Sequence, residues 1–205
     1  MGRINWKPGN MIFPVPAVLV SCGNEEDGYN LVTVSWTGTV CTNPPLCYIS
    51  LKKERLSHEI ISKNREFVIN LSTEKMARAT DWCGVKSGRD FDKFRECGFT
   101  PLSALKVKAP LVAESPVAIE CRVMEIKELG SHDMFLAEVI SVSVDDQYLD
   151  NDSGAFNMNR AGLIASAHGK YCALKEPLGH FGYSIKKPKK KKKKKKTIPR
   201  IKSHP

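Results

Sequence analysis

The 205-residue sequence lacks the short motifs that mark several common enzyme classes. No GxGxxG fingerprint follows a predicted strand, and there is no HExxH, GxSxG, GxxxxGKS or GxxxxGKT segment. The five histidines are too scattered to indicate a metal site. A zinc peptidase, a nucleophile-elbow hydrolase and a P-loop nucleotide hydrolase are therefore disfavoured.

Long apolar runs are also absent, because no run approaches the ~18–20 residues needed to cross a bilayer. The most apolar N-terminal stretch, Met11–Val20, is interrupted by Pro14 and Pro16 and lacks a small-residue cleavage site. It is expected to form a strand and not a signal peptide.

The seven cysteines include no CxxC pair. Their number is odd, and most lie in apolar or β-branched surroundings, as Cys47 does between Leu46 and Tyr48, where cysteine acts as a small hydrophobe. The sequence thus disfavours a disulfide framework, a zinc site and a redox dithiol. It indicates a reduced, cytoplasmic location.

Acidic residues are missing from the C-terminal segment. Residues 186–205 hold 12 of the 32 Lys and Arg and no Asp or Glu. Residues 1–185 therefore carry 20 basic against 22 acidic groups, about −2, although the whole chain carries +10. A nucleic-acid-binding core is disfavoured, because a phosphate-binding domain concentrates Lys and Arg on its own face.

This composition indicates that the chain has two parts. Residues 1–185 are expected to form one domain with a substantial core, and residues 186–205 a disordered lysine-rich tail. One possible function is a non-enzymatic module that this tail tethers to a polyanion, such as nucleic acid or an anionic membrane, in a salt-dependent way. The alternative, which the sequence favours, is a dispensable low-complexity extension.

Short strands separated by turns dominate the predicted secondary structure, since apolar and polar residues alternate in several segments. Strands are expected over Phe13–Cys22, Leu31–Val40, Leu46–Leu51, Phe67–Leu71, Val117–Lys127 and Met134–Val144. Helices are expected to be short and to begin near Ser57, Ser72 and Asp90. This regular spacing, with a hairpin at residues 129–133, favours an antiparallel barrel.

Three hydroxyl side chains share one face of the predicted strand Leu31–Val40. Thr33, Ser35 and Thr37 could donate hydrogen bonds to a polar ligand ring or to a phosphate. A solvated strand face explains the same pattern equally well. Trp36 points to the opposite face, where tryptophan more often belongs to the core than to a stacking site.

Cations and hydroxyls gather where the strand Leu46–Leu51 leads into a helix. Helix N-terminal amides, a Ser hydroxyl such as that of Ser57 and the fork of Arg55 together make a phosphate site. An ordinary charged loop is the commoner meaning of such a segment. His58 is expected to be a cap neighbour and not a catalytic base. The later loop at residues 81–94 offers Lys and Arg to an anion but lacks P-loop spacing.

Taken in order, these segments resemble the flavin reductase-like family with the FMN-binding split barrel, and specifically its flavoredoxin-type branch. The matching sequence segments are NLVTVSWTG at 30–38, NPP at 43–45, SLKKERLSHE at 50–59, FVINL at 67–71, ATDWCGVKSGRD at 79–90 and DKF at 92–94. HGKY at 168–171 and LGHFG at 178–182 resemble the family's closing segment. Each motif alone is weak, but six in register over residues 10–185 are specific. The lysine run is not part of the pattern.

The resemblance implies a mainly β fold, an FMN-binding split barrel formed by a six-stranded antiparallel Greek-key barrel with a few short helices. It implies a homodimer with FMN sites near the subunit interface. The flavin edge would meet the strand face that begins at Asn30, the ribityl phosphate would meet the cluster around Arg55, and a loop around Lys86 would approach the flavin, from the same or the partner subunit. The implied cofactor-binding residues are Asn30, Thr33, Ser35, Trp36, Thr37, Ser50, Lys52, Arg55, Ser57, Lys86, Ser87, Lys93, His168 and Tyr171.

Two activities are consistent with this resemblance. The first is an NAD(P)H-dependent flavin reductase or oxidoreductase that passes electrons through FMN to free flavin, ferric iron or a redox protein. The second is a flavoredoxin-like electron-transfer protein with a protein donor and no use of nicotinamide. The missing dinucleotide fingerprint does not separate them, because split-barrel reductases do not use that fold. Neither activity requires a catalytic side chain or a metal, because the chemistry belongs largely to the cofactor.

Overall fold

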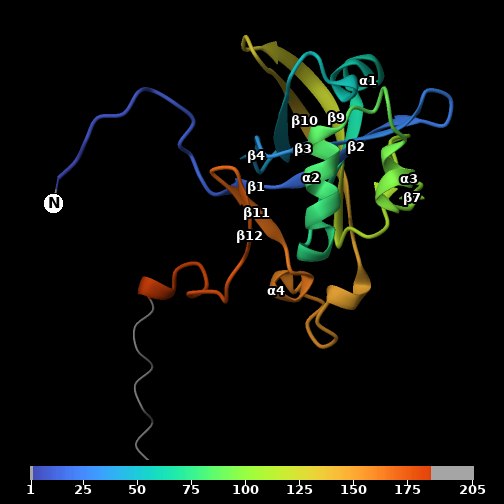
Figure 1. Ribbon diagram of the computed structural model, residues 1–205. Helices are drawn as coiled ribbons and strands as arrows, with labels where there is room; N and C mark the ends of the chain where they lie inside the picture. Colours follow the sequence, from blue (N-terminus) through green and yellow to red (C-terminus); the bar gives the residue numbers. More distant parts are fainter. Residues whose placement is uncertain (1, 186–205) are drawn as a thin grey trace, which may run out of the picture. The chain divides into compact units, whose positions relative to one another are not determined.

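Residues 2–185 are described by a computed structural model of the chain (Figure 1). They fall into two units, of which the first ends at Leu174 and holds the strands of the barrel. The second begins at Lys175, and its described part contains the short 3-10 helix η3, Tyr183–Ile185. The lysine-rich tail predicted from the sequence lies outside the described residues, and the domain boundary at residue 185 stays a prediction.

The first unit is built on one antiparallel sheet, whose order among the described residues is β3-β2-β6-β9-β10-β5-β4. The strands are β2 Val18–Asn24, β3 Gly28–Val34, β4 Thr37–Cys41, β5 Leu46–Leu51, β6 Glu66–Leu71, β9 Val117–Glu128 and β10 Asp133–Val144. The edge strands β3 and β4 are consecutive in the chain, separated only by Ser35 and Trp36. The sheet therefore closes on itself, and residues 28–41 serve as one bent strand at the seam.

This closure confirms the barrel that the sequence predicts, because β3 and β4 together count as one of its six strands. The predicted strand Leu31–Val40 is broken by the bend at Ser35, which the alternating pattern does not reveal. The Greek-key step lies between β5 and β6, since β6 pairs with β2 and β9 and not with β5. The intervening helix α1, Leu56–Asn64, packs Ile61 into the barrel core.

Strand β2 is buried on both faces. Val18 and Val20 lie in the barrel core, whereas Leu19 packs on the outer face against Cys83 and Phe94. These two residues belong to helices α2 (Ala77–Val85) and α3 (Lys93–Cys97), which cover the outside of β2 and β3 (Figure 1). Two-sided burial explains why this strand is an apolar run and not an alternating one.

Helix α1 begins near Ser57, as predicted, but Ser57 is not its N-terminal cap. Arg55 occupies the N-terminal cap, and Ser57 lies within the first turn. The Ser57 hydroxyl accepts a hydrogen bond from Asn30 of β3 and is therefore not available to cap the helix. The remaining elements are β1 Val15–Pro16, η1 Glu74–Met76, β7 Pro101–Leu102, β8 Leu111–Val112, η2 Asp146–Tyr148, α4 Met158–Ala161, β11 Ile164–Ala167 and β12 Lys170–Ala173. None of the helices in residues 2–185 is long and apolar enough to cross a membrane.

Candidate functional site

Two adjoining cavities, of about 220 and about 200 Å³, lie where the bend between β3 and β4 meets the start of α1. Both are lined by Val32 and Arg55. The first cavity is completed by Thr33, Val34, Ser35, Trp36, Ser50, Leu51, Lys52 and His132. The second is completed by Asn30, Glu54, Leu56, Ser57, Lys86, Ser87, Gly88 and Lys93. Taken together they reach the lower end of the ~300–1,000 Å³ typical of ligand pockets.

The first cavity combines an aromatic wall with hydroxyl side chains. The rings of Trp36 and His132 lie 4.5 Å apart between centroids and are tilted by 44°. Val34 and Leu51 add apolar surface, and Ser35 and Ser50 add hydroxyl side chains to the lining. A flat aromatic ligand with polar edges suits this lining.

The hydroxyl face predicted on residues 33–37 is divided by the bend. The Thr33 hydroxyl donates to the carbonyl of Thr80 in α2, and Ser35 lies at the bend itself, yet both residues line the first cavity. The Thr37 hydroxyl donates to the carbonyl of Tyr48 over 2.6 Å and lies outside both linings. The backbone N–H of Ser50 donates to the Trp36 carbonyl over 2.9 Å, which fixes the bend against β5.

The second cavity contains two buried or half-buried cations, Lys93 and Arg55, and one carboxylate, Glu54, whose 3.6 Å ion pair is with Lys52 and not with either of them. Lys93 is 3% exposed, and its Nζ donates to the carbonyls of Leu31 and Cys83 over 2.8 and 2.7 Å. Burial lowers the pKa of Lys93 below its ordinary value. Arg55 is half-buried, and no described residue accepts a hydrogen bond from its guanidinium or forms an ion pair with it. A buried ammonium retains a third donor, so the pair suits an anion.

The other cations of the site are more exposed. Lys52 forms an ion pair of 3.6 Å with Glu54. Lys86 follows the last residue of α2 and places its Nζ 5.6 Å from the ring centre of Phe91. The Ser87 hydroxyl accepts from the backbone N–H of Arg89 over 3.1 Å, which shapes the loop between α2 and α3.

A neighbouring hollow of about 520 Å³ is less suited to an anion. Three carboxylates, those of Asp27, Asp90 and Asp92, contribute to its lining. Its one lining cation, Arg89, is paired with Glu59 over 3.1 Å. An anionic ligand would therefore be repelled there and attracted to the second cavity.

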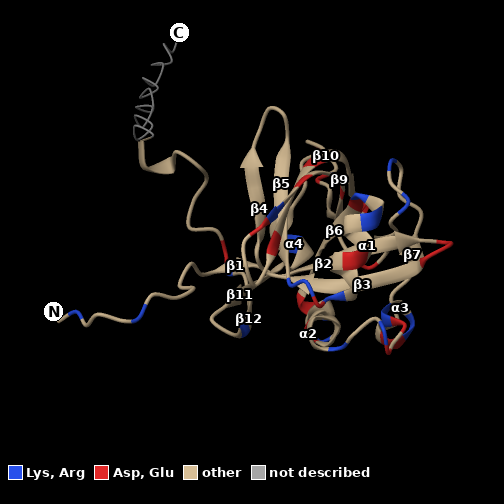
Figure 2. Ribbon diagram, turned by 90° about the horizontal axis from the view of Figure 1, so that it is seen from above, with Lys and Arg blue, Asp and Glu red and all other residues tan. Residues whose placement is uncertain are grey.

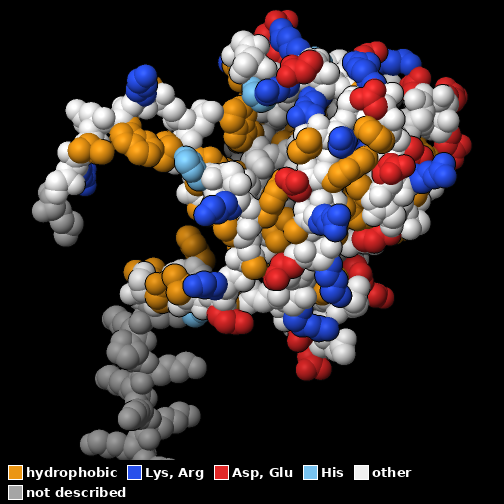
Figure 3. Space-filling model, in the orientation of Figure 1, with side chains coloured by type: hydrophobic (Ala, Val, Ile, Leu, Met, Phe, Trp, Pro, Cys, Tyr) orange, Lys and Arg blue, Asp and Glu red, His pale blue; other side chains and the backbone are white. Residues whose placement is uncertain are grey.

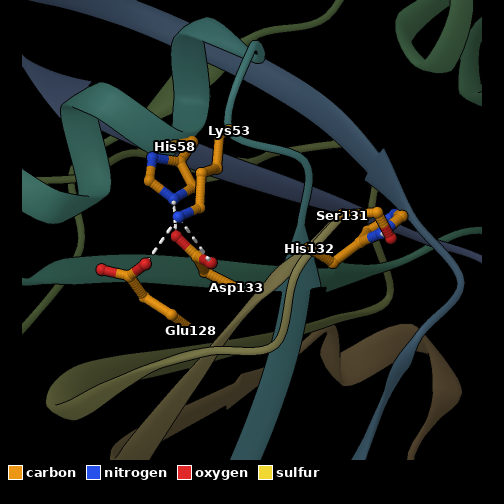
Figure 4. A network of polar contacts seen from close by, with 6 residues as sticks. All are labelled: Lys53, His58, Glu128, Ser131, His132 and Asp133. Carbon is orange, nitrogen blue, oxygen red and sulfur yellow. Dashed lines mark hydrogen bonds and ion pairs between the residues drawn. The ribbon is translucent and has the colours of Figure 1, made fainter.

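A polar network beside the first cavity fixes the start of α1 (Figure 4). The Nε2 atom of His58 lies 2.8 Å from Oδ2 of Asp133, the first residue of β10. Lys53 adds contacts of 2.7 Å to Glu128 and 3.6 Å to Asp133. Because Asp133 follows His132 directly, this network also holds the His132 end of the hairpin at the cavity.

Sequence reasoning missed His132 and Gly88. Burial, followed by the charge of Lys52, lowers the pKa of His132, so its imidazole is neutral at pH 7. A Cβ atom on Gly88 would lie 2.1 Å from Oδ1 of Asn30, so the loop backbone approaches that amide closely. The only sequence signals were a histidine at a predicted hairpin and a glycine in a basic loop.

Eleven of the fourteen predicted residues line one or both cavities. These are Asn30, Thr33, Ser35, Trp36, Ser50, Lys52, Arg55, Ser57, Lys86, Ser87 and Lys93. Three lie elsewhere, and Thr37 is the first of them. His168 occupies the turn between β11 and β12, with its ring 5.7 Å from that of Phe13. Tyr171 lies on β12, where burial and the nearby Asp81 carboxylate raise its pKa. The described residues contain no group of three or more side chains placed to hold a metal ion.

Comparison with known proteins agrees with this fold. The chain belongs to the family described as "Flavin reductase like domain", whose sequence model matches residues 10–175. It is similar to the flavoredoxin of Desulfovibrio vulgaris (Miyazaki F), with a TM-score of 0.83 and 28% identity, covering 90% of this chain and 100% of that one. The resemblance deduced from the motifs is thereby confirmed.

Two further proteins are similar, the first at lower identity and the second over a shorter part of the chain. An FMN-binding protein from Thermus thermophilus, solved with bound 1-cyclohex-2-enone, has a TM-score of 0.73 and 23% identity, covering 88% of this chain and 98% of that one. At this identity the likeness shows the fold alone. The reductase component of a Rhodococcus opacus 4-nitrophenol 4-monooxygenase/4-nitrocatechol 2-monooxygenase is 29% identical over 108 residues, 53% of this chain and 55% of that protein.

Proposed function

We propose that the chain binds FMN across the two cavities. The ring system would lie in the first cavity against Trp36, and the ribityl phosphate in the second, held by Arg55, Ser57 and Lys93. The observation that carries this assignment is the pair of cations without carboxylate partners, beside an aromatic wall. A flavin, when bound, supplies hydride acceptance and one- or two-electron transfer.

The residues of the site would bind and orient the cofactor. Ser35 and Ser50 offer hydroxyls to the polar edge of the ring, where donors stabilise negative charge on its reduced form. The Trp36 and His132 rings would shield one side of the cavity from water. Fluorescence titration of flavin-free protein tests the assignment: FMN is expected to bind more tightly than riboflavin, which lacks the phosphate. Equal affinities would contradict the phosphate site.

We further propose that the protein is an oxidoreductase that takes electrons from NADH or NADPH. The acceptor would be free flavin, ferric iron or a redox protein. Its similarity to a monooxygenase reductase component supports this activity. The expected result is oxidation of NADH or NADPH that is accelerated by added FMN or ferric iron.

A second candidate is electron transfer from a protein donor, as in a flavoredoxin-like protein. The chain's similarity to the Desulfovibrio flavoredoxin extends over the whole length of that protein, which favours this second candidate. The same assay separates the two candidates. Bound flavin that stays oxidised in excess NADH and NADPH, but is reduced by a low-potential ferredoxin, would support the protein-donor candidate and contradict the nicotinamide one.

We also propose a homodimer, supported by exposed apolar side chains in the N-terminal segment (Figure 3). Ile4, Trp6 and Ile12 are 83%, 70% and 88% exposed, more than an isolated subunit normally leaves in water. Sedimentation equilibrium of the full chain tests this. A dimer mass is expected, and a monomer mass at micromolar concentration would contradict it.

The proposal that the protein tethers to polyanions rests on residues outside the described part. Within residues 2–185, Lys and Arg are interspersed with Asp and Glu around α1, α2 and α3 (Figure 2). Deleting residues 186–205 is therefore expected to abolish retention on heparin and to leave FMN binding unchanged. Loss of FMN binding on that deletion would contradict the separation of the two functions.

A further inference from the structure

Two thiols from different helices meet beside the second cavity. The Sγ atoms of Cys83, in the last turn of α2, and Cys97, the last residue of α3, lie 3.5 Å apart. Figure 1 and Figure 2 show the two helices as neighbours on the same side of the sheet. Fourteen positions separate the cysteines in the sequence, so the absence of CxxC spacing gave no sign of this contact.

The chain between these cysteines forms part of the candidate site. Lys86, Ser87 and Gly88 lie on the connecting loop and line the second cavity. Lys93 begins α3, and its Nζ donates to the carbonyl of Cys83 over 2.7 Å. A bond between the two sulfurs would close a ring of chain that contains every lining residue of this loop.

We propose that Cys83 and Cys97 are a reversible disulfide site, oxidised by a peroxide, and that the disulfide holds the 86–92 loop against the second cavity. The first part stands on the sulfur geometry alone. The second part rests on the proposed function, because its consequence is slower release of FMN.

The reaction balances with hydrogen peroxide as the two-electron oxidant. The sulfur of Cys97 attacks one peroxide oxygen and the O–O bond breaks, which yields a sulfenic acid and one water. The sulfur of Cys83 then attacks the sulfur of this sulfenic acid. The S–O bond breaks, the S–S bond forms, and the thiol proton leaves with the hydroxyl group as a second water. Two thiols lose two electrons in total, and the peroxide gains them.

The order of these steps follows from burial. Cys83 is fully buried, whereas Cys97 is half-buried and is the thiol that an oxidant can reach. A disulfide needs an S–S distance of ~2.05 Å, so the sulfurs must approach by roughly 1.5 Å. Besides the contact to Cys83, the Cys97 thiol makes a weak 4.0 Å contact with the Ala79 carbonyl, which this approach would break or lengthen.

Both thiols are protonated at neutral pH. Burial raises the pKa of Cys83 to about 12 and also raises the pKa of Cys97. The thiolate is the reactive form, so both thiols react slowly at neutral pH, and the oxidation is expected to need excess peroxide.

The chain carries its own control pair. Cys47 and Cys121 lie 3.6 Å apart in the barrel core, where they are 6% and 0% exposed. Phe67 and Phe135 belong to the same buried cluster. Neither thiol of this pair is as exposed as Cys97, so peroxide is expected to oxidise it more slowly, although its sulfurs lie at nearly the same distance. Cys172 is exposed and reports that the oxidant was effective.

Peroxide treatment of the full chain, followed by alkylation and peptide mass mapping, tests the disulfide. The expected product is a peptide pair joined through Cys83 and Cys97 that has lost two hydrogen atoms and is restored by dithiothreitol. Cys47 and Cys121 should be alkylated only after unfolding. Recovery of Cys83 and Cys97 as free thiols from a sample in which Cys172 is fully oxidised would overturn the site.

The effect on the loop is measured as the rate of FMN release. Oxidised protein is expected to release FMN several-fold more slowly than reduced protein. The Cys97→Ser variant, treated with the same peroxide, should keep the rate of reduced protein. A mapped disulfide with an unchanged release rate would overturn the loop closure and leave the disulfide site standing. A chain that binds no FMN would overturn the loop closure together with the proposed function, whereas the mapping result would be unaffected.

Discussion

The side-chain amide of Asn30 donates a 2.8 Å hydrogen bond to the hydroxyl of Ser57, and this bond joins β3 to the first turn of α1. Both residues are buried. The next residue, His58, contacts Asp133 of β10, so the start of α1 is fixed to two strands. Arg55, the N-terminal cap of α1, is thereby held at the boundary between the two cavities.

Replacing Arg55 by Ala is expected to weaken FMN and to leave riboflavin nearly unaffected. A charge-assisted hydrogen bond to phosphate contributes about 1.5–3 kcal/mol, which is roughly a 10- to 100-fold change in Kd. Fluorescence titration with both ligands measures the difference. Arg78→Ala is the matched control, because Arg78 is an exposed arginine of α2 that lines neither cavity. Equal weakening of FMN and riboflavin would place Arg55 away from the phosphate.

FMN affinity is expected to fall at alkaline pH through the titration of Lys93. Burial lowers the pKa of this ammonium below 10.5 in the free protein. A bound phosphate favours the charged form. Affinity is therefore complete below the lowered pKa and decreases as pH rises through it, because binding must then take up a proton.

Titrations from neutral pH upward, with riboflavin as the ligand that lacks the phosphate, measure this effect. Lys93→Met should remove the extra pH dependence of FMN relative to riboflavin. If FMN and riboflavin lose affinity in parallel in the unaltered protein, Lys93 does not contact the phosphate.

The close approach of Gly88 to Asn30 predicts a non-additive pair of substitutions. A Cβ atom at residue 88 would lie 2.1 Å from Asn30 Oδ1, and the bond to Ser57 prevents that amide from moving aside. Gly88→Ala is therefore expected to displace the loop and to weaken FMN by about tenfold or more, ~1.4 kcal/mol.

The same substitution in an Asn30→Ala background should cost much less, because the opposing oxygen is gone. A double-mutant cycle on FMN affinity, with circular dichroism as a check that each variant is folded, measures the coupling. Additive effects of the two changes would contradict the predicted contact.

Glu120 of β9 ties the 105–107 segment to the barrel, and its replacement is expected to lower stability. Its buried carboxylate accepts backbone N–H bonds from Leu105, Lys106 and Val107 at 3.1, 2.6 and 3.2 Å. In Glu120→Gln one oxygen becomes a donor that faces these donors. The free energy of unfolding is expected to fall by about 2–4 kcal/mol.

Urea denaturation measures this change. Glu125→Gln, on the exposed part of the same strand, should change stability by less than about 0.5 kcal/mol. A Glu120→Gln protein as stable as the Glu125→Gln control would contradict the role given to the three bonds.

The strands and their barrel could be predicted because local patterns determine them. β9 and β10 are 12 residues long each and alternate between buried and more exposed residues over part of their length, and the turn between them is short. The bend at Ser35 could not be predicted, since closure of the barrel at that point depends on pairing with both β2 and β5. The expectation that Ser57 caps a helix failed for a similar reason. Its tertiary bond to Asn30 competes with the local role.

Within the candidate site, prediction worked where charged and hydroxyl residues cluster along the chain, as they do around Arg55. It failed where the fold brings distant segments together. His132 reaches the first cavity only because the β9–β10 hairpin ends beside Trp36, and Cys83 meets Cys97 only because α2 and α3 pack together. Composition and residue spacing do not predict such contacts between distant segments.

The visible absorption spectrum of the purified full-length protein, followed by chromatography of any released chromophore, tests the central claim most directly. We predict a flavin spectrum and FMN as the released compound, or the appearance of that spectrum on a retained protein band after FMN is added. A colourless protein that also fails to retain added FMN would contradict the assignment of the two cavities.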